Sequence, residues 1–97
     1  MIIYEIDIEI DNIIYEKYII WLKKHIKIML LFDGFIKAKI YLYNKNNVEK
    51  NILVHYYVSN IIQLNDYINN KSNKIRFSGI KEFNGLVKID RRVLTEL

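Results

Sequence analysis

The segment "IYEIDIEI", residues 3–10, decides the fold because its side chains alternate strictly in polarity. From Tyr4 to Ile10 the even-numbered positions are aromatic or aliphatic, and the odd-numbered positions between them are all acidic. A period of two is that of a β-strand, whose successive side chains point to opposite faces. We therefore expect a strand with one face in the core and an acidic face turned away from it.

The next stretch, residues 12–32, changes to a helical period, and Asp11 is placed to cap its start. At about 100° per residue, the side chains divide into an apolar arc and a charged arc. The arc expected to face the sheet holds Tyr18, Leu22, His25 and Met29, and the charged arc holds Glu16, Lys23, Lys24 and Lys27. Asp33-Gly34 is expected to end the helix, with Gly34 in the left-handed position after the last turn.

The remainder of the chain predicts two more strands, a second helix and a last strand. Residues 35–44 and 52–59 alternate in polarity, and an asparagine-rich turn at 44–47 lies between them. Ser59 is expected to cap the second helix, whose apolar positions are Ile61, Leu64, Tyr67 and Ile68. Residues 69–84 are polar and irregular, with a helical turn expected at 80–83, and residues 85–94 form the last strand.

The element order β-α-β-β-α-β predicts a single α+β domain over residues 1–97 with a ferredoxin-like fold. Its four-stranded antiparallel sheet has the order 4-1-3-2, with both helices on one face. This order places the acidic side of the first strand beside Lys88, Asp90 and Arg92 of the fourth. Opposite charges on neighbouring strands are favourable, which agrees with the predicted order.

Composition excludes several function classes. The chain has no cysteine and two histidines, so disulfides and thiolate ligands are absent and a dedicated metal site is not expected. The N-terminus lacks a basic region before its apolar residues, and no apolar run approaches the ~20 residues of a membrane span, so we expect a cytoplasmic protein. The acidic row of the first strand would repel phosphates, which argues against nucleic-acid binding despite a net charge of +4.

Five stretches carry a resemblance to a known family: "MIIYEIDIEI" (1–10), "WLKKHIKIMLLFDGF" (21–35), "HYYVS" (55–59), "LNDYI" (64–68) and "FNGLVKIDRRVL" (83–94). They resemble a small bacterial domain-of-unknown-function family in the dimeric α/β-barrel superfamily, which includes the antibiotic-biosynthesis monooxygenases. The chain reads "NKSNK" at 70–74, where that family often has a His-Ala-Pro-like stretch. Haem-degrading members of the superfamily carry their histidine on the second helix, whereas Trp21 and His25 lie on the first, so the resemblance implies no haem chemistry here.

Trp21, His25 and Met29 share one side of the first helix, and two interpretations of this stripe stay open. In the first, the stripe is core and His25 is enclosed and hydrogen-bonded. In the second, His25 lines a cleft in which the predicted topology also gathers Tyr4, Tyr56 and Arg91 and where an anion or enolate could bind. Arg91 is the one charge expected on the helix-facing side of the sheet, and its alternative role is to cap carbonyls at the end of the first helix.

The opposite side of the sheet carries aromatic residues as well as balanced charges. Tyr41, Tyr43, Tyr57 and Phe35 are expected on this side, which favours a covered surface over a solvated one. In the resembling superfamily, this side closes on the sheet of a second subunit to form a barrel. The resemblance therefore implies a homodimer whose interior holds a ligand cavity, with Tyr57 and Tyr41 among its lining residues.

Two function classes follow from these observations. The first is a protein that binds a small planar organic ligand, either as a simple binder or as an oxygenase or isomerase without a cofactor. In it, His25 acts as base or hydrogen-bond donor, Arg91 and Tyr56 steady negative charge, and Trp21 and Tyr4 contact the ligand. The second class is a non-catalytic homodimeric interaction module, whose function is its dimer surface.

Overall fold

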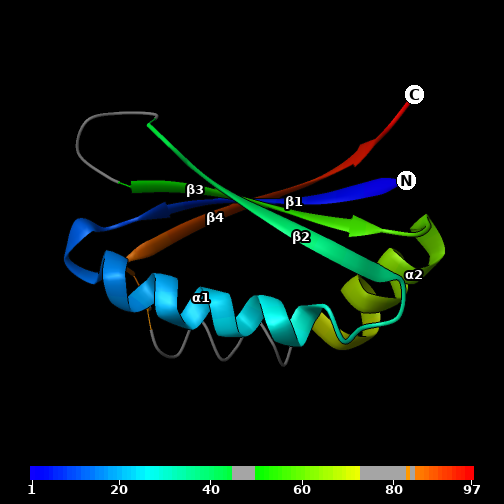
Figure 1. Ribbon diagram of the computed structural model, residues 1–97, viewed down its shortest axis with the longest axis horizontal. Helices are drawn as coiled ribbons and strands as arrows, with labels where there is room; N and C mark the ends of the chain where they lie inside the picture. The colour runs from blue at the N-terminus through cyan, green and yellow to red at the C-terminus, as the bar shows by residue number, and fades with distance from the viewer. Residues whose placement is uncertain (45–49, 73–82, 84) are drawn as a thin grey trace.

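The computed structural model describes residues 1–44, 50–72, 83 and 85–97 of the chain. Its elements, in chain order, are strand β1 (Ile2–Ile10), 3₁₀ turn η1 (Asn12–Ile14), helix α1 (Tyr15–Met29), strands β2 (Phe35–Tyr43) and β3 (Lys50–Val58), helix α2 (Ile61–Asp66), π-helical turn η2 (Tyr67–Lys71) and strand β4 (Val87–Thr95). Figure 1 shows both helices below the sheet, with α1 running along it and α2 near one end.

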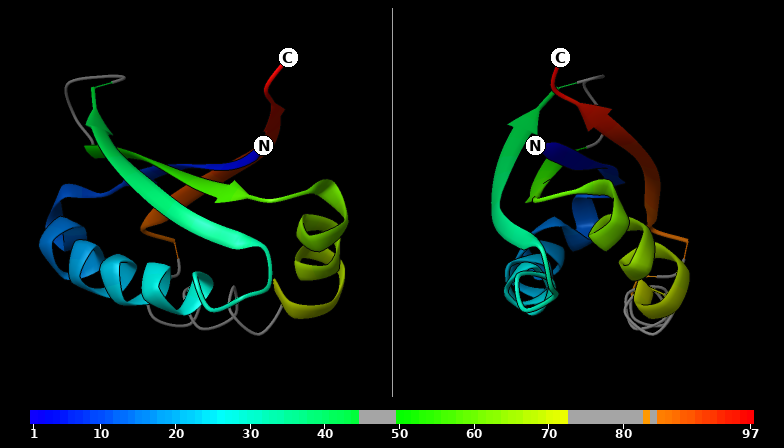
Figure 2. Two further views of the ribbon diagram at one scale, coloured as in Figure 1. Left: turned by 45° about the vertical axis from the view of Figure 1, so that its right-hand side comes forward. Right: turned by 90° about the vertical axis from the view of Figure 1, so that its right-hand side faces the viewer.

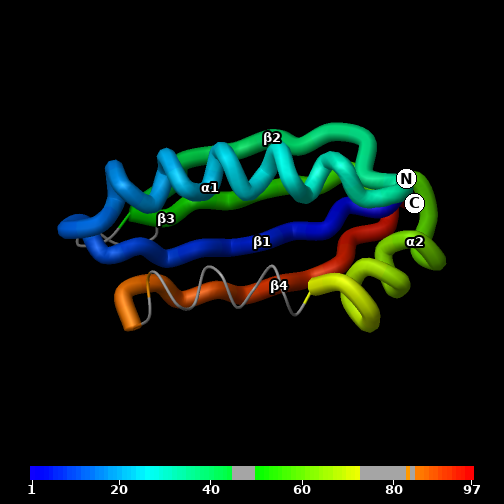
Figure 3. The backbone as a smooth tube through the Cα atoms, turned by 90° about the horizontal axis from the view of Figure 1, so that it is seen from below, coloured from blue at the N-terminus to red at the C-terminus, as the bar shows by residue number. Residues whose placement is uncertain are grey.

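The four strands form one antiparallel sheet of order β2-β3-β1-β4. This is the predicted order, so the ferredoxin-like α+β fold is confirmed. The two turned views in Figure 2 keep both helices on the same side of the sheet. Figure 3, seen from that side, shows α1 running along the half of the sheet that contains β2 and β3, while β4 lies at the opposite edge. The expected helical turn at 80–83 falls outside the described residues, apart from Phe83.

The core lies between α1 and the apolar side of the two central strands. Tyr18, Leu22, Ile26 and Met29 are the buried positions of α1, and they recur at helical spacing. They face alternate residues of β1 and β3, which are buried at Tyr4, Ile8, Ile10, Ile52, Val54, Tyr56 and Val58. At about 25 cal/mol per Å² of apolar surface, this contact is the main stabilising term of the fold.

The charges on the outer face, defined here as the sheet face away from the helices, agree with the prediction at two of three positions. Glu5 lies opposite Arg92 and Glu9 opposite Lys88 in the register of β1 and β4. The third pair is Asp7 with Asp90, which places two like charges side by side. Asp7 instead accepts a hydrogen bond of 2.5 Å from the hydroxyl of Tyr43 on the edge strand β2.

The prediction that Phe35 lies on the outer face is wrong. The pairing of β2 with β3 shifts between Phe35 and Lys37, so one extra residue stands in β2 at this point. Such a bulge reverses which side of the sheet the preceding residue faces. Phe35 is consequently buried on the helix side, where its ring lies 5.8 Å from the ring of Tyr56 and 5.2 Å from that of Tyr67.

Two helix ends also differ from the prediction. Helix α1 ends at Met29, and Gly34, at φ +85°, belongs to the turn that leads into β2 rather than to the helix end. A side chain at Gly34 would collide with Gln63, 2.1 Å away. Helix α2 is capped by Asn60, whose side chain accepts a 2.9 Å hydrogen bond from the amide of Gln63, and Ser59 instead donates to the carbonyl of Gly34. The cap at Asp11 is as predicted, although it starts the 3₁₀ turn η1.

Glu5 occupies an unusual position, because it is a carboxylate with an exposed fraction of only 4% on the outer face. It accepts hydrogen bonds from Arg92 on β4 and, at 2.8 Å, from His55 on β3, so one row of side chains connects three strands. Burial alone would raise the pKa of Glu5, but the hydrogen bonds and positive charges of Arg92 and His55 outweigh it and hold the pKa below its usual 4.5.

Replacing Glu5 by Gln should therefore reduce the stability of the fold in a pH-dependent way. At pH 7 we expect a loss of about 1 kcal/mol, a modest figure because Arg92 is largely solvent-exposed. As the pH falls below about 4.5, the unfolded carboxyl binds a proton before the folded one does, so this contribution disappears as the pH passes the lowered pKa. Urea unfolding of wild-type and Glu5→Gln proteins at pH 7 and pH 3 measures the difference.

The matched control is Asp90→Asn, which removes an exposed acid on the neighbouring strand of the same face. It should leave stability unchanged or slightly raised at pH 7, because Asp90 faces Asp7. An equal loss of stability in Glu5→Gln and Asp90→Asn would contradict a stabilising role for the hydrogen bonds of Glu5 with Arg92 and His55.

Candidate functional site

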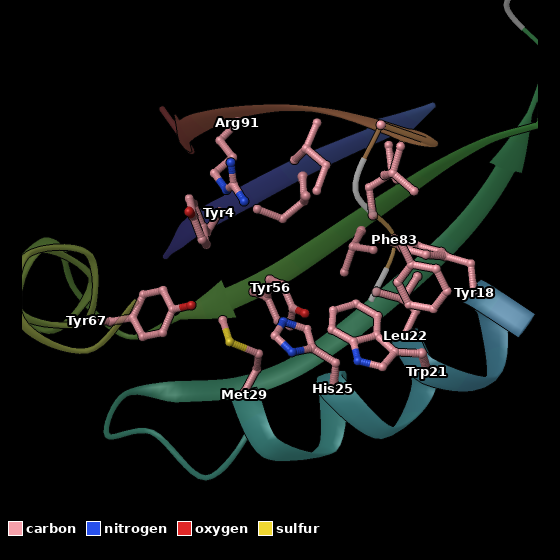
Figure 4. Close-up of a pocket in the computed structure, with 16 residues that line it drawn as sticks. Tyr4, Tyr18, Trp21, Leu22, His25, Met29, Tyr56, Tyr67, Phe83 and Arg91 are labelled. Atoms are coloured by element: carbon pink, nitrogen blue, oxygen red, sulfur yellow. The ribbon is translucent and has the colours of Figure 1, made fainter. Parts of the chain in front are cut away.

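A cavity of about 410 Å³ lies between α1 and the sheet, here called the α1–sheet cavity. Its described lining comes from α1, from the helix-facing sides of β1, β3 and β4, and from residues beyond α2. Figure 4 shows these side chains directed into a common space. The volume is within the ~300–1,000 Å³ typical of small-molecule sites, and most of the wall is aliphatic or aromatic.

Helix α1 supplies Trp21 and His25, one turn apart on the side that faces the cavity. Their rings are stacked, with centroids 4.7 Å apart and an angle of 13° between the planes. Tyr18 and Phe83 pack against Trp21 at 5.4 and 5.7 Å, so an aromatic cluster restrains the position of the His25 ring. The imidazole itself is half-buried.

The sheet supplies the polar groups on the other side of the cavity. Tyr4 and Tyr56 are paired in the register of β1 and β3, with ring centroids 6.3 Å apart. Arg91 stands on the same side of β4, opposite Ile6. Tyr67, from the turn after α2, completes this wall, 6.2 Å from Tyr4 between ring centroids. The cavity thus brings together residues from five separate elements, namely α1, β1, β3, η2 and β4.

Both burial and Arg91 act on His25. Desolvation lowers the pKa of its imidazole, and the positive charge of Arg91 lowers it further, to about 4. The imidazole is therefore neutral at pH 7 and has a nitrogen lone pair for accepting a proton or a hydrogen bond. None of the side-chain hydrogen bonds among the described residues involves His25, Tyr56 or Arg91.

Two of the cavity tyrosines, Tyr18 and Tyr56, remain protonated at pH 7. Burial raises the pKa of Tyr18 to about 12, although Arg91 opposes the shift. Burial also raises the pKa of Tyr56, and the neighbouring tyrosines Tyr67, Tyr18 and Tyr4 add to the effect. Their hydroxyls are thus neutral donors at pH 7.

Arg91 lies at the accessible edge of the cavity, since its side chain lines the space and is also exposed to solvent. No acid occurs among the described lining residues, and no ion pair of the described residues includes Arg91. The alternative role, capping of α1, is not found, because no hydrogen bond joins Arg91 to a described carbonyl. Arg91 thus presents a cation to the cavity without an acidic partner in the described chain.

The structure divides the predicted site residues into two groups. Tyr4, Trp21, His25, Tyr56 and Arg91 line the α1–sheet cavity. Tyr41 and Tyr57 lie on the outer face, so they cannot meet a ligand bound beside His25. On that face Tyr41 packs edge-on against His55 at 5.5 Å, and the amines of Lys37 and Lys39 lie 4.8 and 5.6 Å from the ring of Tyr57.

Sequence reasoning did not place Tyr18, Tyr67 or Phe83 in the site. Tyr18 belongs to the arc of the first helix that is expected to face the sheet, and it lies one turn before Trp21. This spacing is the sequence signal that places Tyr18 beside Trp21 in the site. No comparable signal marks Tyr67 or Phe83, because their approach to the cavity depends on the path of the chain after α2.

The sequence as a whole, residues 1–97, matches the family model described as "Domain of unknown function (DUF4286)". The chain belongs to this family. The predicted membership in a bacterial domain-of-unknown-function family is thereby confirmed. No curated protein matches the sequence.

Several solved structures share the fold of this DUF4286 chain. One, provisionally assigned as an antibiotic biosynthesis monooxygenase of Deinococcus radiodurans, has a TM-score of 0.77 at 10% identity, over 100% of this chain and 93% of that one. SnoaB, a cofactor-independent oxygenase from Streptomyces nogalater, has a TM-score of 0.73 at 4% identity (98% and 92% covered). The haem-degrader MhuD of Mycobacterium tuberculosis, solved with two haems bound, has 0.70 at 9% identity (100% and 96% covered). At such low sequence identities, the TM-scores show a common fold and nothing more.

Two further findings concern metals and membranes. Within the described ranges, no three His, Asp or Glu side chains are grouped so that they could hold a metal ion. Among the helices that the structure describes, none has the length and apolar character required to cross a bilayer.

The lowered pKa of His25 leads to a prediction for titration by NMR. The ring resonances of His25 should show a midpoint near pH 4 rather than near 6.5. Because the unfolded histidine binds a proton first, stability should fall as the pH drops from about 6.5 to about 4, and His25→Phe should remove this part of the slope while retaining a ring against Trp21. A His25 midpoint near 6.5 would show that the ring is not desolvated.

Proposed function

We propose that this protein binds a small planar organic ligand in the α1–sheet cavity. The observation that carries the proposal is a cavity of about 410 Å³ that both His25 and Arg91 face. His25 is neutral and half-buried, and Arg91 has no ion-pair partner among the described residues. Buried polar groups normally find partners inside the protein. Polar groups that face the cavity and have no hydrogen-bond or ion-pair partner among the described residues can instead bind a polar group of a ligand.

The shape of the walls favours a flat, largely apolar molecule. Tyr18, Trp21 and Phe83 form an aromatic cluster at one part of the cavity, with centroid distances of 5.0 to 5.7 Å. Aromatic side chains pack well against a planar ring, and the aliphatic residues of β1 and β4 add apolar contact. Tyr4 and Tyr56 can then direct hydroxyl groups at a polar substituent.

The chemistry available at this site is proton transfer next to a stabilised anion. A neutral His25 can accept a proton from a carbon acid or phenol, and Arg91 with the Tyr56 hydroxyl can stabilise the enolate or phenolate that forms. Return of the proton to another carbon would be an isomerisation, and reaction of the anion with molecular oxygen would be an oxygenation without a cofactor. SnoaB, which has the same fold, is described as a cofactor-independent oxygenase.

The second candidate is a non-catalytic homodimeric interaction module, which the outer face favours. Tyr41 is 43% exposed there, and the nearly buried Glu5 lies between His55 and Arg92 on the same face. Tyrosine and arginine are enriched in protein–protein interfaces, whose apolar core is surrounded by a polar rim. A second copy of this chain covering the outer face would also be compatible with ligand binding on the helix side, so the two candidates can coexist.

Filling the α1–sheet cavity should abolish ligand binding. We expect 1-naphthol and 1,4-naphthoquinone to raise the melting temperature of the wild-type protein, because only the folded state has the cavity. Ile89→Trp, which replaces an aliphatic side chain of the cavity wall on β4 with a bulkier indole, should remove the shift. Ile20→Trp, at a position 61% exposed on α1, is the matched control and should retain it. No shift for any probe in the wild-type protein would reject ligand binding.

A dimer through the outer face should be visible by sedimentation. At micromolar concentration the wild-type protein should sediment as a dimer, and Tyr41→Asp should shift it toward monomer by adding a charge to the outer face. Ile62→Asp, at a position 77% exposed on α2, should leave the dimer intact. A wild-type monomer under these conditions would reject the interaction module.

A further inference from the structure

The charges around the α1–sheet cavity are strongly one-sided. Alternation along β1 places its three acids on the outer face, whereas Arg91 projects from β4 on the helix side. Among the described lining residues there is one full charge, that of Arg91, and there is no carboxylate. A cation in a largely apolar site attracts an anion and repels another cation.

The remaining polar groups of the cavity are compatible with an anion. Tyr18 and Tyr56 stay protonated at pH 7 because burial raises the pKa of each, so their hydroxyls can donate hydrogen bonds. His25 is neutral and can donate from its ring N–H. None of these groups adds a negative charge that would compete for Arg91.

We propose that the cavity selects a planar aromatic carboxylate, with the carboxylate at Arg91 and the ring system against the aromatic cluster of Tyr18, Trp21 and Phe83. This inference rests on the proposed function and names its ligand class. The guanidinium offers two parallel N–H donors, a geometry that matches a carboxylate. In Figure 4, Arg91 and the aromatic cluster lie at different parts of the cavity wall, so one ligand would span the space between them.

Two isosteric probes separate charge from shape. Calorimetry at pH 7 with 2-naphthoate and 2-naphthamide compares the same ring system carrying a carboxylate or a neutral amide. The wild-type protein should bind 2-naphthoate about tenfold more tightly, a moderate factor because Arg91 is solvent-accessible. Raising the salt from about 0.05 to about 0.5 M should weaken binding of the naphthoate but not of the naphthamide.

Variants of β4 then assign the preference to one residue. Arg91→Met should bind both probes with the affinity that the wild-type protein has for 2-naphthamide. Lys88→Met, which removes a cation from the outer face of the same strand, should retain the tenfold preference. The salt dependence in the wild-type protein tests the proposal independently of either variant.

The possible failures are distinguishable. Equal affinity for the two probes in the wild-type protein would overturn anion selection and leave ligand binding intact. A preference that persists in Arg91→Met, or that disappears in Lys88→Met, would overturn the assignment to Arg91. Absence of binding by both naphthalene probes would overturn this inference, and the neutral probes 1-naphthol and 1,4-naphthoquinone would then decide whether the proposed function also fails.

Discussion

The two-sided character of strand β1 is the constraint on which the rest of the structure depends. β1 is central in the sheet, with β3 on one side and β4 on the other, so its alternation sets what both faces can be. Its Tyr4, Ile8 and Ile10 side chains are buried under α1, whereas Glu5 and its acidic neighbours cannot face that core. A shift of one residue in either pairing would exchange the two faces, which fixes the register strongly.

This constraint also separates the two candidate surfaces. The helix side acquires an apolar cavity whose described lining carries one cation, Arg91. The outer face acquires the oppositely charged pairs of Glu5 with Arg92 and Glu9 with Lys88. Arg91 and Arg92 are adjacent in sequence, yet one faces the cavity and the other donates to Glu5. The alternation of β1 keeps its acids on the outer face, away from the cavity. An anion bound at Arg91 would therefore not be repelled by these acids.

Element order, strand order and the helix side of the site were predictable because they depend on periodicity, which is a local property of the sequence. Tyr4, Trp21, His25, Tyr56 and Arg91 were placed together for this reason, and the structure does bring them to one cavity. Local deviations from periodicity were not predictable. A bulge in β2 reversed Phe35, and nothing in the alternation of residues 35–44 marks the extra residue.

Interactions that join several strands could not be predicted from the sequence either. The row from Arg92 through Glu5 to His55 needs three strands in one register, and no single segment contains it. The Asn60 cap was missed in favour of its neighbour Ser59 because both are good capping residues, and only backbone geometry distinguishes them. Tyr67 and Phe83 reach the cavity through a part of the chain whose pattern is irregular.

Trp21 provides the most direct test of the account, because it is the one tryptophan of the chain and stands in the wall of the α1–sheet cavity, stacked on His25. Its indole N–H gives a single resonance in a ¹⁵N-labelled sample, which can be followed during titration with 2-naphthoate. Binding in the α1–sheet cavity should cause a saturable shift of this resonance together with the ring resonances of His25. A Trp21 resonance that does not move, or that moves linearly without saturation while the protein stays folded, would contradict a ligand site in this cavity.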